Sequence, residues 1–206
     1  MRRLERLDVE VRTGVEATPA AVLAERPDAI VVATGSRPAP PPFAVDGAVV
    51  LDGADVLRGN LPRGRRVVLL DLAHRYEGAA LADTLVAAGN DVQWLTPAPA
   101  VMIDMDWGTR RVLLRRLAGA GLVRRPETTL LAADGDGVSA LDVGDGSVHR
   151  IDAVDCVVVA GGRDADDALA RLLRETGIEL HTVGDCVAPR HVAIALYEAE
   201  LAGRAL

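Results

Sequence analysis

The segments Asp28-Ala29-Ile30-Val31-Val32-Ala33-Thr34-Gly35 and Leu180-His181-Thr182-Val183-Gly184-Asp185 decide the fold class of this chain. Each is a short apolar run that stops at turn-forming residues, the pattern of a buried β-strand. Between them, further short strands alternate with segments of helical spacing. This alternation predicts an α/β fold with a doubly wound parallel sheet. No strand followed by G-x-G-x-x-G precedes either motif, so the usual pyrophosphate-binding loop is missing and we expect a partial chain.

Composition excludes several classes of function. The chain has 206 residues, half of them hydrophobic, a net charge of -7 and only 2% aromatic residues, so nucleic acid is not expected as a partner. All 23 basic residues are arginines, which excludes a catalytic lysine. No apolar run reaches the length of a membrane span and no signal peptide precedes the first strand, so we expect a cytoplasmic protein without a membrane partner.

Proline and glycine divide the chain into three segments. Pro38 and residues 40–42 form a stiff, extended connector, because each proline fixes φ and removes a hydrogen-bond donor. We therefore expect residues 1–42 to belong to a first nucleotide-binding domain and residues 43–162 to form an inserted βαβ domain. Residues 163–206 then return to the first domain.

Within these segments the elements are expected at the following places. Strands are expected at residues 67–70, 91–95 and 155–160, and an antiparallel meander at 122–152, where Asp-Gly pairs signal turns. Helices are expected at residues 78–88, 106–120, 166–175 and 191–205, the first two stopped by Gly89 and Gly121.

Each strand-end motif leaves two interpretations open. Gly184 would let the backbone approach a ligand, and Asp185 could accept hydrogen bonds from a ribose or ribitol hydroxyl. Asp185 could equally cap the turn before the last helix. Ala33, Thr34 and Gly35 could line the same site or only permit a tight turn.

The motifs in this order resemble one family. The chain is similar to the C-terminal part of Old Yellow Enzyme-like NADH:flavin oxidoreductases, the family of trimethylamine and dimethylamine dehydrogenases and 2,4-dienoyl-CoA reductase. The resemblance is strongest at residues 28–38, 67–96 and 181–204, and most specific in Gly184-Asp185-Cys186-Val187-Ala188-Pro189-Arg190. It implies a Rossmann-like FAD/NAD(P)-binding fold, with an incomplete first nucleotide domain that holds FAD, or ADP in the same site.

The resemblance also implies roles for particular residues. Gly184 and Asp185 would face the flavin ribityl or diphosphate region, with Cys186 and Arg190 in the same motif, and Ala33, Thr34 and Gly35 would lie along the floor of that site. Gly161 and Gly162 match the family's second strand-end glycine motif. The resemblance places FMN and a 4Fe-4S cluster only in an upstream barrel, in the same or a partner chain, so this chain alone would carry no catalytic residue of the full-length oxidoreductase.

The inserted domain departs from a nicotinamide site. Residues 71–78 contain one glycine where a pyrophosphate loop needs three, and Thr96 stands where an acid would bind a ribose hydroxyl. NAD(P)H is therefore possible but disfavoured. His74-Arg75-Tyr76 could hold an anion, although a solvated loop is the simpler interpretation.

Metal binding and partners complete the expectations. His181, Asp185, Cys186 and His191 match no standard metal spacing, so no metal is expected. An electron-transfer protein is a possible partner and the full-length protein is expected to be a homo-oligomer. The alternative is a non-catalytic module that stabilises or regulates a partner flavoprotein.

Overall fold

The computed structural model describes residues 7, 9–118 and 121–206. The chain folds as two units, one made of residues 1–37 and 164–206 and the other of residues 38–163. We call them unit 1 and unit 2. Two short strands carry the chain between the units and pair with each other, β2 (Ser36–Pro38) and β12 (Arg163–Ala165).

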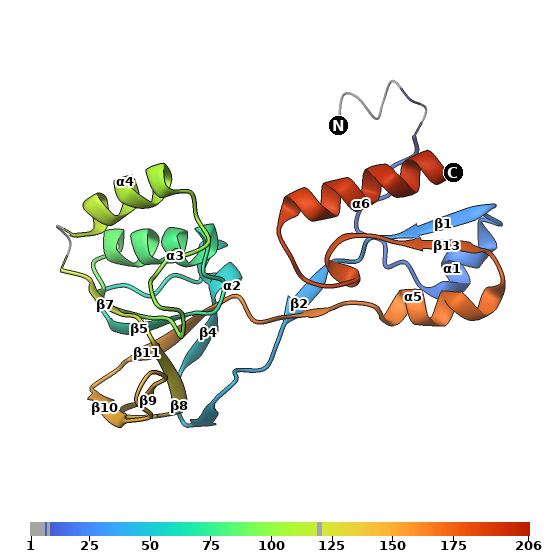
Figure 1. Ribbon diagram of the computed structural model, residues 1–206. Coiled ribbons are helices and arrows are strands. Elements are labelled where there is room, and N and C mark those ends of the chain that lie inside the picture. The colour runs from blue at the N-terminus through green and yellow to red at the C-terminus, as the bar shows by residue number, and fades with distance from the viewer. Residues whose placement is uncertain (1–6, 8, 119–120) are drawn as a thin grey trace. The chain divides into compact units, whose positions relative to one another are not determined.

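Unit 1 is built on two parallel strands. β1 (Ala29–Val32) pairs with β13 (Glu179–Thr182) in register from Ala29 opposite Glu179 to Val32 opposite Thr182. From residue 9 onward, its helices and 3-10 turns are α1 (Pro19–Ala24), α5 (Ala168–Leu173), η2 (Arg174–Thr176), η3 (Gly184–Cys186) and α6 (Val192–Ala205) (Figure 1). Among its described residues, the hydrophobic cluster of this unit is small, with five buried members, Ile30, Val32, Ala170, Leu173 and Cys186.

Unit 2 contains a five-stranded parallel sheet. The strand order is β4-β11-β5-β6-β7, with bounds Val50–Asp52, Cys156–Ala160, Arg66–Asp71, Asp91–Leu95 and Val123–Arg125. A second sheet has the order β10-β9-β8-β3, with bounds Val148–Asp152, Gly137–Asp142, Thr128–Asp134 and Ala44–Asp46. Three helices complete the unit, α2 (Gly53–Leu57), α3 (Tyr76–Ala87) and α4 (Trp107–Ala118) (Figure 1).

The central strand β5 shows why unit 2 has three layers. Because side chains alternate along a strand, Val67 and Leu69 enter the cluster that packs against the helices. Val68 and Leu70 enter the cluster shared with the second sheet. All four are buried, which explains the uninterrupted apolar run that a strand covered on both faces requires.

Most expected elements are confirmed, with shifted ends. The helix expected at 78–88 spans Tyr76–Ala87, and Gly89 follows it with a left-handed φ of 79°. The helix expected at 106–120 is described over Trp107–Ala118, and residues 119–120 lie outside the described residues. The helix expected at 166–175 is shorter, Ala168–Leu173, because the chain tightens into a 3-10 turn before Gly177.

One expectation is wrong in part. Residues 128–152 do form an antiparallel meander, but Val123–Arg125 does not belong to it. This segment is β7, which pairs parallel to β6 at the edge of the large sheet. The helix α4 between them makes a second βαβ crossover, which a three-residue strand is too short to signal by its own alternation.

Candidate functional site

The parallel pairing of β1 and β13 brings both strand-end motifs of unit 1 to one edge of the sheet. The N–H of Val183 donates to the carbonyl of Val32 at 3.0 Å, which holds the two exits side by side. Ala33, Thr34 and Gly35 therefore lie next to the Gly184–Cys186 turn. Ligands of doubly wound sheets bind beyond this carboxyl edge.

Asp185 is the acidic residue of this edge. The hydroxyl of Ser36 donates to Asp185 Oδ2 at 3.2 Å, and the N–H of Arg190 donates to Oδ1 at 3.1 Å. The carboxylate is thus fixed by one contact from each motif while remaining partly exposed. Each oxygen keeps a lone pair, so the same carboxylate caps the 185–190 turn and can still accept a ligand hydroxyl.

Gly184 is held by a residue that sequence reasoning missed. Its N–H donates to Glu198 Oε2 at 2.8 Å, and Arg190 pairs with the other oxygen of Glu198. The Gly184 N–H, and after it Arg190, lower the pKa of Glu198. A Cβ at Gly184, whose φ is +73°, would lie 3.3 Å from the Cβ of Ala195, so α6 packs closely on this turn. The spacing of 14 residues between Gly184 and Glu198 gave no signal for this contact.

The other motif is tied to the segment after β12. Thr34 Oγ1 donates to the carbonyl of Asp166, and Arg37 pairs with the Asp166 carboxylate. The Asp166 N–H donates to the carbonyl of Gly35 at 3.0 Å. Gly35 has a φ of +80° and nothing within 4 Å of an added Cβ, so open space borders the turn.

The side chain of Cys186 and the pair Gly161 and Gly162 do not lie at the strand-end site of unit 1. The thiol of Cys186 is buried in the core of unit 1, with its Sγ 3.2 Å from the carbonyl oxygen of Val32 and 3.1 Å from that of Val183, so its single proton is directed to these two acceptors. Only its backbone could therefore contact a ligand. Gly161 and Gly162 belong to unit 2, at the end of β11, so they are not part of the cluster in unit 1.

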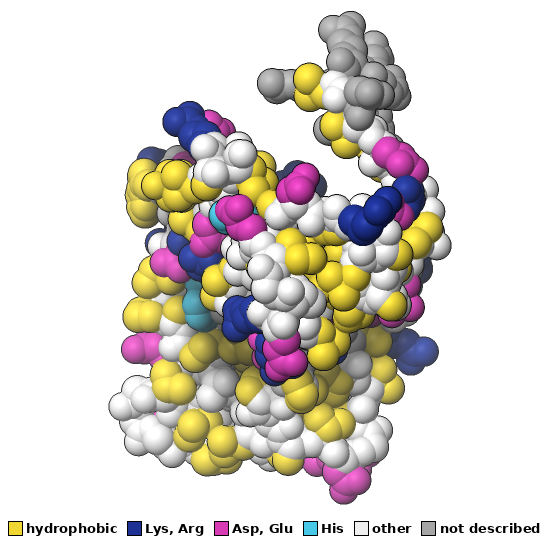
Figure 2. All heavy atoms as spheres, turned by 90° about the vertical axis from the view of Figure 1, so that its right-hand side faces the viewer, with side chains coloured by type: hydrophobic (Ala, Val, Ile, Leu, Met, Phe, Trp, Pro, Cys, Tyr) yellow, Lys and Arg dark blue, Asp and Glu magenta, His cyan; other side chains and the backbone are white. Residues whose placement is uncertain are grey.

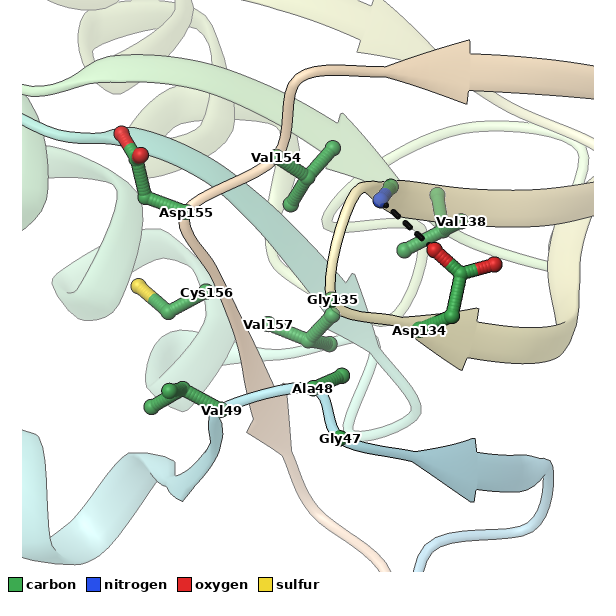
Figure 3. Close-up of a pocket in the computed structure, with 11 residues that line it drawn as sticks. Gly47, Ala48, Val49, Asp134, Gly135, Val138, Val154, Asp155, Cys156 and Val157 are labelled. Carbon is green, nitrogen blue, oxygen red and sulfur yellow. Dashed lines mark hydrogen bonds between the residues drawn. The ribbon is translucent and has the colours of Figure 1, made fainter.

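The hollows found among the described residues of unit 2 lie away from the carboxyl edge of its five-stranded sheet. Figure 3 shows a cavity of about 50 Å³ near Gly47, Asp134 and Val157, where Asp134 accepts the Gly137 N–H at 3.0 Å. This volume suits water rather than a nucleotide. A wider hollow of about 390 Å³, lined by Leu51, Leu61 and Cys156 among others, lies at the amino ends of the strands.

Within the described residues, no group of three His, Cys, Asp or Glu side chains is arranged to hold a metal ion. None of the described helices combines the length and apolar character that crossing a bilayer requires.

Comparison with known proteins identifies the fold family. The family model described as pyridine nucleotide-disulphide oxidoreductase matches residues 4–190. Among solved structures, histamine dehydrogenase from Rhizobium sp. 4-9 has a TM-score of 0.81 at 26% identity, over 93% of this chain and 31% of that one. A 2-naphthoyl-CoA reductase has a TM-score of 0.81 at 27% identity, over 96% of this chain and 30% of that one.

Two relatives found by sequence are also oxidoreductases, like the two proteins of known structure. An N,N-dimethylglycine/sarcosine dehydrogenase of Chromohalobacter salexigens is 26% identical over 95% of this chain and 34% of its own length. An NADH oxidase of Thermoanaerobacter brockii is 26% identical over 88% of this chain and 28% of its own length. The chain thus spans about a third of the length of each of these four proteins.

The parallel sheets of the structure and the family match over most of the sequence lead to the same assignment, and confirm the expected Rossmann-like FAD/NAD(P)-binding fold. The chain belongs to the pyridine nucleotide-disulphide oxidoreductase family, as a nucleotide-binding domain.

Proposed function

We propose that this chain is the nucleotide-binding portion of a flavin-dependent oxidoreductase, and that unit 1 contributes half of a site for FAD, or for ADP in its place. The observation that carries the proposal is the partly exposed carboxylate of Asp185 at the carboxyl edge of β1 and β13. Bound FAD would supply the electron-accepting chemistry.

The residues of unit 1 fit such a group by position and by chemistry. Asp185 would accept a hydrogen bond from a ribityl or ribose hydroxyl, as aspartates at this edge do. Gly35 and Gly184 both have positive φ, and open space borders the turn at Gly35. Glu198 would not touch the nucleotide; it would hold the Gly184 turn and Arg190 in place.

We propose that the substrate-converting part of the enzyme lies outside the 206 residues of this chain. Since the chain spans about a third of its relatives, an FMN barrel with its iron–sulfur cluster would lie in the same polypeptide or in a partner chain. Substrate conversion would take place there. We further propose a cytoplasmic location, an electron-transfer partner and a homo-oligomeric full-length protein.

The test is nucleotide binding by the protein isolated from its source, in the assembly it forms there. Bound FAD and ADP are identified by chromatography of the denatured sample, and their affinity is measured by calorimetry. Replacing Asp185 by Ala should weaken binding about 10-fold to 100-fold, the range for a hydrogen bond to a charged group.

Asp136→Ala is the matched control, because Asp136 is an exposed aspartate in a turn of unit 2. It should leave the affinity unchanged. A protein that binds neither nucleotide, or an Asp185→Ala variant with unchanged affinity, would refute the proposal.

A second candidate is an accessory module for a partner flavoprotein. Its support is that, among the described residues, β1 pairs only with β13, so its other edge is available to a strand from another polypeptide. A separate barrel subunit that copurifies with a nucleotide-free chain would favour this candidate over the first.

A further inference from the structure

The family to which the chain belongs is named for a pyridine nucleotide. In unit 2, such a nucleotide would bind at the carboxyl edge of the five-stranded parallel sheet. In a dinucleotide-binding βαβ unit, glycines between the first strand and its helix let the pyrophosphate reach the helix N-terminus. The corresponding place in unit 2 lies between β5 and α3. We call residues 72–75 the β5 turn.

The carboxylate of Asp71 already occupies this place. Asp71 is fully buried, and its Oδ1 accepts the N–H groups of Ala73 at 3.0 Å and His74 at 2.9 Å. Its Oδ2 accepts Trp94 Nε1–H at 3.2 Å. A Cβ at Gly78 would lie 2.2 Å from Asp71 Oδ2, so the carboxylate is packed against the first turn of α3.

A second carboxylate, that of Glu77, engages the backbone at the end of the neighbouring strand β11. Glu77 Oε1 accepts the N–H of Gly161 at 3.2 Å. Gly161 itself packs on the β5 turn, since a Cβ there would lie 2.8 Å from the nitrogen of Ala73. The Leu72 N–H donates to the carbonyl of Ala160 at 2.8 Å, which holds the two strand ends together. The N–H of Gly161 is therefore not available to a phosphate.

The position expected for the ribose is also filled. Thr96, at the end of β6, is fully buried, and its Oγ1 lies 3.1 Å from His74 Nδ1. The His74 ring therefore points inward, which the left-handed φ of 58° at this residue permits. Nδ1 of His74 is therefore engaged within the chain.

We propose that Asp71 and Glu77 take the place of a dinucleotide pyrophosphate, so that unit 2 is a closed Rossmann-like domain that binds neither NADH nor NADPH. The N–H groups of Ala73, His74 and Gly161, which border this place, are engaged by the chain's own carboxylates. A bound pyrophosphate would also bring two further negative charges next to Asp71 and Glu77. The residues present thus do not fit the group that the family name implies.

The test is a titration of the ¹⁵N-labelled chain with NADH and with NADPH to about 5 mM, followed at the backbone amides. We expect no saturable shift at the amides of Ala73, His74 and Gly161. Saturable shifts at these three amides would overturn the proposal. Saturable shifts at any other amides of unit 2 would also overturn it, whereas shifts confined to amides of unit 1 would support it, because unit 2 would then be unused.

Hydrogen exchange supplies a readout that needs no ligand. The amides of Ala73, His74 and Gly161 should be protected in the free protein, and rapid exchange at all three would overturn the proposal. Glu77→Ala should accelerate exchange at Gly161, whereas Glu175→Ala, which removes an exposed glutamate of unit 1, should not. A titration with FAD or ADP, followed at Gly184 and Asp185, tests the proposed function separately.

Discussion

Two aspartates at equivalent strand ends have opposite environments. Asp185 lies partly exposed in the 3-10 turn after β13, with two donors and spare lone pairs, whereas Asp71 is the last residue of β5 and is fully buried, accepting a hydrogen bond from Trp94. The sequence predicted the place of Asp185, because the turn follows a short apolar strand. It did not predict the burial of Asp71, which depends on Trp94 in the next strand and on Gly78 in the helix.

The buried Asp71 should leave a signature in the pH dependence of stability. Burial raises its pKa above the usual value, and the three N–H donors only partly offset this effect. A group whose pKa is raised by folding contributes stability below its unfolded pKa and loses it as pH rises through its folded pKa. Relative to Asp71→Asn, the wild-type protein should therefore lose free energy of unfolding as the pH rises above about 4.

Urea unfolding at a series of pH values measures this difference. Subtracting the curve of the variant removes the opposite contributions of Asp134 and Glu198, whose pKa values are lowered by hydrogen-bonding partners. Parallel curves for the two proteins would show that Asp71 does not titrate as its burial requires.

Glu198 should show the opposite behaviour. Its lowered pKa means that its contribution is present above the unfolded value and is lost as the pH falls through the folded one. Glu198→Ala removes the acceptor of the Gly184 N–H, whereas Glu198→Gln keeps an acceptor and loses the charge that faces Arg190. Exchange at the Gly184 amide should be fastest in the Ala variant, and equal rates in both variants would contradict the contact.

At the scale of elements, two helical glycines make a matched pair. Gly78→Ala places a methyl group against the buried carboxyl of Asp71, so it should lower the free energy of unfolding by about 1–3 kcal/mol, as overpacking does. Gly203 lies near the end of α6 with nothing within 4 Å of an added Cβ. Gly203→Ala should raise stability by up to about 1 kcal/mol. Thermal unfolding distinguishes them, and a neutral Gly78→Ala would contradict the packing.

Long apolar strands could be predicted from the sequence, whereas the shortest strands could not. β5, β11 and β13 were predictable because their apolar runs follow turn signals, and α3 because Gly89 ends it. β7 and β3 are three residues each, and both pair parallel to strands distant in the sequence. Pairing of such short strands is decided by tertiary packing, which no local pattern records.

At the scale of the molecule, the two units differ in the amount of core they contain. Among the described residues, unit 2 has two hydrophobic clusters around a five-stranded sheet, whereas unit 1 has one cluster of five buried residues beside a two-stranded sheet. We expect amides of β5 and β11 to exchange more slowly than those of β1 and β13. Mass-spectrometric hydrogen exchange checks this order, and equal protection of both sheets would show a single cooperative unit.

Exposed apolar surface predicts how the chain behaves when isolated. Val31 on β1 and Val192, Leu196 and Tyr197 on α6 are exposed. Figure 2 shows hydrophobic side chains between the charged ones over the face it presents. With one edge of β1 unpaired among the described residues, the isolated chain should self-associate. Light scattering across a concentration series would detect this, and a monomer at every concentration would count against a partial chain.

The paired strands that lead into and out of unit 2 have a consequence for the order of folding. Asp166 N–H donates to Gly35 within unit 1, and Ala39 N–H donates to Gly162 at 2.8 Å within unit 2. In the unfolded chain, pairing β1 with β13 would close a loop of roughly 150 residues, but once unit 2 has folded the free loop is about 20 residues. The entropic cost of closure then falls by about 2 kcal/mol, so the inserted unit assists the assembly of the unit that it interrupts.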